Sequence, residues 1–269
     1  MTRIGKLFER LKEEQRCGMI AYLTAGDPSP AATPALVAAL ERGGADLIEL
    51  GVPFSDPIGD GPVIQQAGDR ALRAGTTVAK VLGMAAEIRK TSEIPLLLFT
   101  YLNPALRYGF ERLARDAKAA GIDGCLLIDV SVEEAREYVT VMRAAELDTV
   151  FLAAPTSTEK RLRLVAEYSS GFVYLVSRTG ITGEQNAIAE SALPLVKRMR
   201  AITKLPLAMG FGISRPEHVN ALAGAVEAVV VGSAIVRQIE KDSTQLEAFM
   251  RSLTAPLART AISLNGDVR

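Results

Sequence analysis

Eight short apolar runs recur along this chain of 269 residues, and each is followed by a stretch with the apolar spacing of a helix. Near-continuous apolar runs are typical of parallel strands that are buried on both faces. The predicted strands span residues 19–24, 47–51, 96–101, 125–128, 149–152, 172–176, 207–209 and 228–231. The predicted helices span residues 34–42, 78–89, 110–119, 132–144, 160–168, 188–202, 216–223 and 244–261. Because no Ser-, Gly- or Pro-rich linker divides these units, the sequence predicts one α/β domain over residues 1–269, folded as a closed (β/α)8 TIM barrel.

An open doubly wound sheet would show the same alternation and is the alternative to a barrel. A further helix is predicted over residues 4–11, where Ile4, Leu7, Phe8 and Leu11 recur at helical spacing. We expect this N-terminal helix to close the bottom of the barrel. In such barrels the chemistry gathers where strands end and loops begin, so the residues that follow the predicted strands are the candidates for a site.

Composition narrows the class of protein. Hydrophobic residues make up 48% of the chain, the formal net charge is +0 and no basic block occurs, so nucleic acid and anionic membranes are poor partners. No stretch reaches the roughly 18 uncharged apolar residues that a membrane span needs, and the charged start of the chain is unlike a secretion signal. Cys17 and Cys125 adjoin apolar strands, so we expect free thiols and a cytoplasmic location.

Two carboxylates, Glu49 and Asp60, lie at positions that are unusual for an acid. Glu49 interrupts the apolar run 47–51, and Asp60 lies in the following loop, which Pro53, Pro57 and Pro62 stiffen. Burying an unpaired carboxylate costs several kcal/mol. The pair therefore predicts a proton-transfer site, while a structural ion pair for Glu49 and an Asp-Gly turn for Asp60 are the alternatives.

Glycine-rich turns follow the seventh and eighth predicted strands, at residues 209–214 and 231–234. Loops at these two strands are the usual phosphate site of a TIM barrel, because backbone N–H groups and helix starts attract an anion. Residues 214–217 have the spacing of a capping box, with Pro216 in the first turn of the helix. The alternative is that these glycines only turn the chain.

The scarcity of histidine and the positions of the lysines exclude several classes of reaction. The single histidine, His218, falls on a predicted helix, where we expect a solvated or capping role, and no lysine falls at a strand end. Metal-dependent aldol chemistry, Schiff-base chemistry and a Ser/His/Asp triad each need one of these. Acid–base catalysis by Glu and Asp remains, on a phosphorylated substrate and without metal or cofactor. The Gly-punctuated loop 177–186 is predicted to be a lid, or else an ordinary exposed loop.

At this point the motifs resemble those of the tryptophan synthase alpha subunit family. The resemblance rests on residues 22–28, 49–62, 101–104, 177–183 and 210–214, in the family's order. It implies cleavage of indole-3-glycerol phosphate to indole and glyceraldehyde 3-phosphate, with no cofactor in this chain. It also implies that indole passes to a pyridoxal-phosphate-dependent beta subunit within an α2β2 assembly.

The resemblance also assigns roles to individual residues. Glu49 and Asp60 are the catalytic pair. Substrate contacts fall to Tyr22, Phe99, Tyr101, Leu126, Leu152, Tyr174, Thr182 and Phe211, although an apolar strand residue is as often ordinary core. Phosphate contacts fall to Gly183, Gly212, Gly232 and Ser233, lid roles to Arg178 and Thr182, and the partner interface to Asp56, Pro57 and Pro104.

Chemical logic agrees with this assignment. An indole carbon leaves only after C3 of the ring is protonated, which puts positive charge on N1. Glu49 is suited to donate that proton and to take the proton of the glycerol hydroxyl, while an ionised Asp60 would stabilise the charge at N1. An apolar surrounding would raise the pKa of Glu49 toward neutrality and so favour both steps.

Two residues depart from the family's usual pattern, and other functions stay open. Ile128 is bulkier than the usual residue and is expected to narrow the indole slot, and Gly59 stands where Ala is common. A stand-alone indole-releasing lyase and a non-catalytic allosteric barrel subunit are the alternatives. A sugar-phosphate epimerase is a third, weakened by the shortage of histidine.

Overall fold

The computed structural model describes residues 1–176, 185–210 and 212–257, with the backbone alone over residues 185–192. Within these ranges a parallel sheet has the strand order β5-β4-β3-β2-β1-β9-β8-β7-β6. The strands are β1 Gly18–Thr24, β2 Leu47–Gly51, β3 Leu96–Thr100, β4 Gly124–Leu127, β5 Asp148–Thr149, β6 Leu152–Ala153, β7 Val173–Val176, β8 Leu207–Gly210 and β9 Ala228–Val231. Neighbouring strands follow one another in sequence, except that β1 pairs with β9, as a barrel requires and an open doubly wound sheet does not.

The fifth strand of the barrel differs from its prediction. Instead of one strand over residues 149–152, the structure has two short pieces, β5 and β6, joined by Val150 and Phe151. The N–H of Val150 donates to the carbonyl of Cys125 at 3.1 Å, and the N–H of Tyr174 donates to the carbonyl of Phe151 at 3.1 Å. This joining segment therefore bonds toward β4 on one side and β7 on the other, which closes the barrel.

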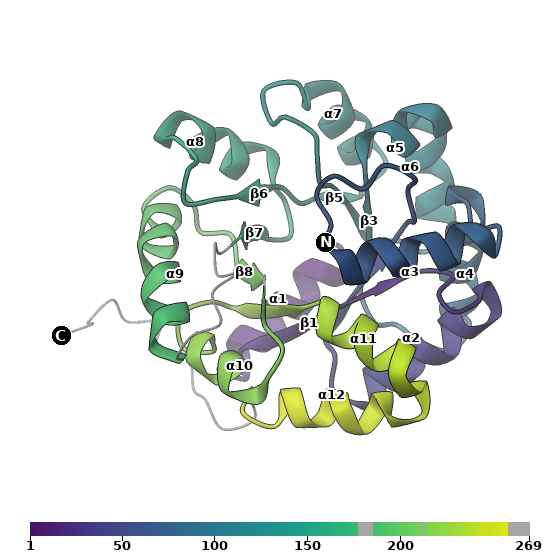
Figure 1. Cartoon of the computed structure of the whole chain (residues 1–269). Coiled ribbons are helices and arrows are strands. Elements are labelled where there is room, and N and C mark those ends of the chain that lie inside the picture. Colours follow the sequence, from purple (N-terminus) through teal and green to yellow (C-terminus); the bar gives the residue numbers. More distant parts are fainter. Residues whose placement is uncertain (177–184, 211, 258–269) are drawn as a thin grey trace.

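Helices surround the strands as an outer ring (Figure 1). They are α1 Arg3–Glu13, α2 Thr33–Arg42, α3 Pro62–Arg73, α4 Val78–Ile88, α5 Leu102–Tyr108, α6 Phe110–Ala119, α7 Arg136–Ala144, α8 Glu159–Tyr168, α9 Gln185–Arg200, α10 Pro216–Leu222, α11 Ser233–Asp242 and α12 Leu246–Thr254, with short 3-10 turns at Pro30–Ala32 and Ser243–Gln245. Three of these, α3, α5 and α11, were not predicted from the sequence. The predicted helix over 244–261 begins as a 3-10 turn and continues as α12.

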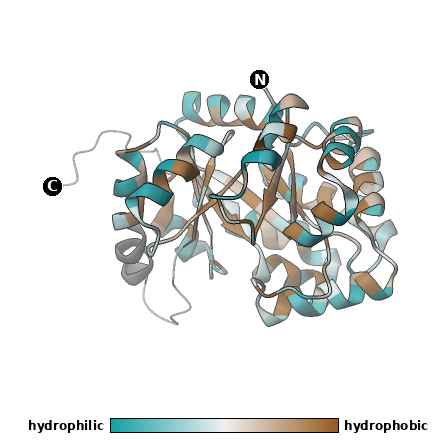
Figure 2. Ribbon diagram, turned by 90° about the horizontal axis from the view of Figure 1, so that it is seen from above, coloured by the Kyte–Doolittle hydropathy of each residue, from teal (hydrophilic) through white to brown (hydrophobic). Residues whose placement is uncertain are grey.

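Side chains alternate between the inside of the barrel and the layer under the helices. On β2, Leu47 belongs to the apolar cluster inside the barrel, whereas Ile48 and Leu50 belong to the cluster between sheet and helices. Figure 2 shows hydrophobic colouring along the central strands, whereas the helices around them carry both hydrophobic and hydrophilic colouring. Cys17 and Cys125 are free thiols and both are buried. No helix in the described part of the chain is long and apolar enough to cross a membrane.

The N-terminal helix α1 closes the bottom of the barrel, as predicted. Its apolar side chains Ile4, Leu7, Phe8 and Leu11 are buried in the cluster that fills the barrel interior, and the ring of Phe8 lies 5.6 Å from that of Phe172.

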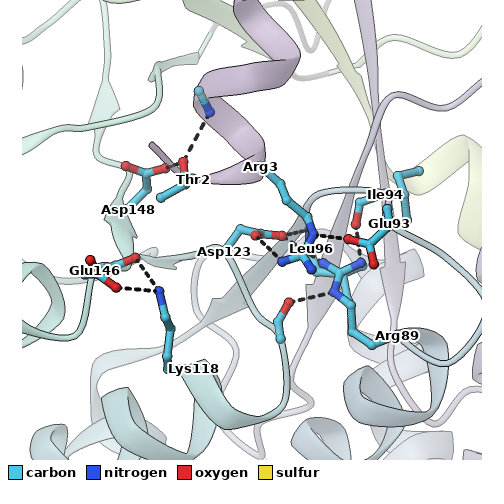
Figure 3. A network of polar contacts seen from close by, with 12 residues as sticks. Thr2, Arg3, Arg89, Glu93, Ile94, Leu96, Lys118, Asp123, Glu146 and Asp148 are labelled. Carbon is cyan, nitrogen blue, oxygen red and sulfur yellow. Dashed lines mark hydrogen bonds and ion pairs between the residues drawn. The ribbon is translucent and has the colours of Figure 1, made fainter.

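Polar contacts hold the start of α1 against the strand beginnings (Figure 3). Arg3 pairs with Glu93 at 2.6 Å and with Asp123 at 3.1 Å. Thr2 accepts from the N–H of Gly5 as the N-cap and donates to Asp148. The helix is therefore fixed both by its apolar face and by ion pairs at its first turn.

Candidate active site

Glu49 lies on the inner face of the barrel, near the carboxyl end of β2. It is opposite Tyr22 of β1, and its side chain is 1% exposed. Its Oε1 atom has no hydrogen-bond partner among the described residues, and no ion pair involves it there. Burial raises the pKa of Glu49 to about 8. At neutral pH the side chain is therefore a protonated acid that faces a cavity.

Asp60 is held by the loop between β2 and α3. Its N–H donates to the carbonyl of Pro57 at 3.0 Å, and its own carbonyl accepts from the Gln65 side chain at 2.8 Å. The hydroxyl of Tyr101 accepts from the N–H of Gly59 at 3.1 Å, which ties this loop to the end of β3. Burial raises the pKa of Asp60, and a hydrogen bond with Tyr101 partly opposes that shift.

A cavity of about 280 Å³ brings the two acids together at the carboxyl ends of the strands. Of the residues assigned from the sequence, those that line it are Tyr22, Glu49, Asp60, Phe99, Tyr174, Gly212, Gly232 and Ser233. The rings of Tyr22 and Phe99 meet edge to face at 5.3 Å and form one apolar wall. The cavity thus combines two acids, aromatic rings and glycine-rich turns.

The glycine side of the cavity comes from the ends of β8 and β9. Gly212 has a φ of +75°, a left-handed conformation that favours glycine. Gly232 is the N-cap residue of α11, and Ser233 is its first residue. Free N–H groups at such a helix start are suited to an anion.

A family model described as "Tryptophan synthase alpha chain" matches residues 8–261. The chain belongs to this family. It is 67% identical over 261 residues to the tryptophan synthase alpha chain of Solibacter usitatus, an alignment that covers 96% of this chain and 98% of that protein. It is 44% identical over 263 residues to that of Geotalea daltonii, covering 96% and 100%.

Solved structures agree with this membership. Tryptophan synthase subunit alpha from Legionella pneumophila matches with a TM-score of 0.90 at 35% identity, over 97% of this chain and 100% of that one. A chain of tryptophan synthase from M. tuberculosis matches with a TM-score of 0.88 at 35% identity, over 96% and 100%. These matches extend over the whole barrel, so the tryptophan synthase alpha fold applies to the chain as a whole.

Some residues that the tryptophan synthase alpha resemblance assigns to the substrate do not line this cavity. Tyr101 lies behind the Asp60 loop, where its ring packs 5.2 Å from that of Phe54. Leu126 is fully buried in the barrel interior, and Leu152 lines a neighbouring cavity at the broken fifth strand. The residues Arg178, Thr182, Gly183 and Phe211 lie outside the described residues.

The turn before α10 also departs from its predicted form. Arg215, not Ser214, is the N-cap residue, and no side chain caps the helix, so the predicted capping box is wrong; Pro216 does occupy the first turn. The N–H of Ser214 instead donates to Nδ1 of His218 at 3.4 Å. The chain's single histidine therefore contacts the turn that precedes α10 and does not cap the helix. Among the described residues no group of three or more His, Cys, Asp or Glu side chains is placed to hold a metal ion.

Gly59 and Ile128, the two departures from the family pattern, also line the cavity, as do Ile213 and Ser214 of the glycine-rich turn. The lining residues that the sequence did not single out are Gly61, Ile64, Val230 and Arg237. Ile64 and Arg237 belong to α3 and α11, two helices that were not predicted from the sequence. For Arg237 a signal was present, because it follows Ser233 by four residues, a spacing that puts both on one face of a helix.

Proposed function

We propose that this chain is a carbon–carbon lyase that cleaves indole-3-glycerol phosphate to indole and glyceraldehyde 3-phosphate. The observation that carries the proposal is Glu49, a carboxyl group that is 1% exposed, has an unpaired oxygen among the described residues and lines the same cavity as Asp60. A buried carboxyl with a raised pKa in a cavity is typical of a general acid.

The protonation state of Glu49 allows it to serve twice. With a pKa of about 8, Glu49 holds a proton at neutral pH and donates it to C3 of the indole ring. The ring, now positively charged at N1, accepts the electron pair of the bond to the glycerol carbon as that bond breaks. The Glu49 carboxylate then takes the proton of the hydroxyl whose carbon becomes the aldehyde. The acid is regenerated, so the cycle needs no other proton source.

Asp60 supplies the negative charge in this scheme. Its pKa is raised by burial, but its side chain is only partly buried and a hydrogen bond with Tyr101 favours the ionised form. An ionised carboxylate near N1 stabilises the positive charge that develops there. Gly59, Asp60 and Gly61 all line the cavity, which supports a role for the Asp60 carboxylate there.

We extend the proposal to the assembly: the chain pairs with a beta subunit and passes indole to it. Asp56 and Pro57 lie in the loop after β2, and Pro104 lies on α5. Beside them are two large apolar side chains exposed to solvent, Ile58 (78%) and Leu106 (54%). Exposed apolar side chains on two neighbouring segments favour a protein interface there. A cytoplasmic location, expected from the free thiols, stays a prediction.

The test is release of glyceraldehyde 3-phosphate from indole-3-glycerol phosphate, by the purified chain alone and with a beta subunit added. We expect slow release alone and a strong rise with the partner. Ile58→Asp should weaken the rise without changing release by the chain alone. Fast release that no partner changes would favour the stand-alone lyase instead. No release under either condition, by a folded chain, would refute the lyase assignment and favour the non-catalytic barrel.

A further inference from the structure

We propose that Arg237 holds the phosphate group of the substrate through its guanidinium, as the cation that complements the N–H groups of the Gly232–Ser233 turn. This inference rests on the proposed function, since it concerns the phosphate end of the same substrate. It assigns a charged side chain to an end of the cavity that otherwise offers glycines and hydroxyl groups.

The geometry of α11 brings Arg237 to the turn. The helix begins at Ser233, and Arg237 lies four residues later, so the two side chains share one helix face about 6 Å apart along the axis. Both residues line the cavity of about 280 Å³, together with Gly212 and Gly232. An arginine side chain is long enough to cover one helical turn, which allows its guanidinium and the turn to contact one anion.

The acids that line the cavity favour a cation beside a bound phosphate group. Of the described residues that line it, Arg237 is the only one with a positive side chain. The carboxylic acids among them are Glu49 and Asp60. A phosphate dianion in a cavity with two carboxyl groups is repelled by either of them when ionised. Arg binds phosphate with two parallel hydrogen bonds, which offsets that repulsion and fixes the orientation of the group.

Among the described residues, no neighbouring acid pairs with the guanidinium of Arg237. It is exposed and makes no ion pair among the described residues. The acid three residues further along α11, Glu240, is already paired with Arg70 at 2.8 Å. Arg70 is fixed in turn by Asp27, at 2.7 and 2.9 Å. The helix neighbours of Arg237 at four residues, Ser233 and Lys241, carry no negative charge, so its guanidinium remains free for a ligand.

The expected signature is a change in KM. A contact to the phosphate, which is remote from the bond that breaks, stabilises the bound substrate and the transition state alike. Arg237→Ala should therefore raise KM by about 10- to 100-fold, the range for a charge-assisted hydrogen-bonding pair, with kcat within about 2-fold. Arg237→Lys should recover part of the loss, because the charge returns without the two-pronged geometry. Lys241→Ala, the same loss of charge on the same helix, should leave KM unchanged.

Binding measured without turnover separates this inference from the proposed function. Calorimetry with glycerol 3-phosphate and with indole, which has no phosphate, should show that Arg237→Ala weakens only the first ligand. An active chain whose KM and glycerol 3-phosphate affinity survive Arg237→Ala overturns the inference and leaves the lyase intact. Equal loss for both ligands also overturns it, as damage to the fold. A wild-type chain that binds glycerol 3-phosphate through Arg237 without cleaving indole-3-glycerol phosphate sinks the function and keeps the phosphate contact.

Discussion

Two buried carboxylates at opposite ends of the barrel, Asp123 and Glu49, differ in their partners. At the amino end Asp123 is 5% exposed and is held by Arg3, by Arg89 at 2.8 Å and by the N–H of Leu96 at 2.9 Å. At the carboxyl end Glu49 is buried even more deeply, and one of its oxygens has no partner among the described residues. Burial is therefore common to both acids, and what distinguishes Glu49 is an oxygen without a partner among the described residues.

A second aspartate at the amino end of the barrel, Asp46, is held in the same way. Asp46 pairs with Arg16 through two hydrogen bonds of 2.7 and 2.9 Å and accepts from the N–H of Met19 at 2.9 Å. Each of these aspartates thus pairs with an arginine and accepts from a backbone N–H near the start of a strand. Such paired charges anchor the strand beginnings, so the carboxyl end can keep an unpaired acid without the barrel losing its register.

The comparison predicts its largest effect at Glu49. Glu49→Gln removes the proton donor and keeps the shape, so kcat for cleavage of indole-3-glycerol phosphate should fall by about 10³- to 10⁴-fold. Steady-state kinetics with the beta subunit present measures this change. Glu9→Gln, an exposed acid on α1, is the matched control and should leave kcat unchanged. A loss below about 10-fold in Glu49→Gln would contradict the catalytic role.

At the amino end the effect should fall on stability. Asp123→Ala leaves Arg89, which is largely buried, without its carboxylate, and should lower the free energy of unfolding by about 3–5 kcal/mol. Once folded, the variant should keep kcat within about 2-fold, because the network lies at the far end of the barrel. Urea unfolding and kinetics on one preparation measure both quantities. Glu93→Ala, which removes an 80% exposed partner of Arg3, should cost under about 1 kcal/mol.

The unpaired acid should also leave a mark on the pH dependence of stability. In the folded chain Glu49 has a pKa of about 8, raised by burial from 4.5, so between these values it holds a proton that the unfolded chain has lost. Its contribution is therefore unfavourable above pH 4.5, and it grows by up to about 1.4 kcal/mol per pH unit until pH 8.

Glu49→Gln removes that contribution. The variant should be about as stable as the wild type near pH 4.5 and increasingly more stable toward pH 8. Thermal or urea unfolding at several pH values measures the difference between the two chains, in which all other titrating groups cancel. A difference that stays constant with pH would show that Glu49 is ionised in the folded chain. That result would also remove the acid from the proposed first step.

Features of the fold that depend on hydrophobic periodicity and composition were predicted from the sequence. Strand alternation over residues 47–51 puts Glu49 on the same face as Leu47, which the structure shows to be the inner face. The apolar spacing of residues 4–11 was sufficient to predict that α1 closes the barrel bottom. The split of the fifth strand was not predictable, because Val150 and Phe151 are as apolar as a strand requires and only the hydrogen bonds across the barrel reveal the break.

The parts of the site that were missed depend on contacts between distant segments. Helix α3 follows a proline-rich loop and carries polar residues, so its apolar face is evident only once the barrel is built. The spacing of Arg237 from Ser233 was visible in the sequence, but only the fold shows that Arg237 lines the cavity. Local pattern thus identified the two acids and the glycine turns that line the cavity, whereas the shape of the cavity and its single described cation came from the fold.

The smallest expected effect tests how tightly the carboxyl end is packed. A Cβ at Gly59 would come within 3.1 Å of Cδ1 of Ile128 and 3.3 Å of the Tyr101 hydroxyl. The two departures from the family pattern therefore face each other, and the small residue makes room for the large one. Gly59→Ala should push Ile128 toward the indole slot and lower kcat/KM by a few-fold.

Ile128→Val removes the atom that clashes, so it should restore most of this loss when combined with Gly59→Ala. A double-mutant cycle on kcat/KM should then give a coupling of about 0.5–1 kcal/mol. Gly83→Ala on α4, where an added Cβ meets nothing within 4 Å, is the control and should leave kcat/KM unchanged while raising stability by up to about 1 kcal/mol. Additive effects of Gly59→Ala and Ile128→Val would mean that the loop of Gly59 moves away freely. The carboxyl end of the barrel would then be less tightly packed than the amino end, just as Glu49 is less fully paired than Asp123.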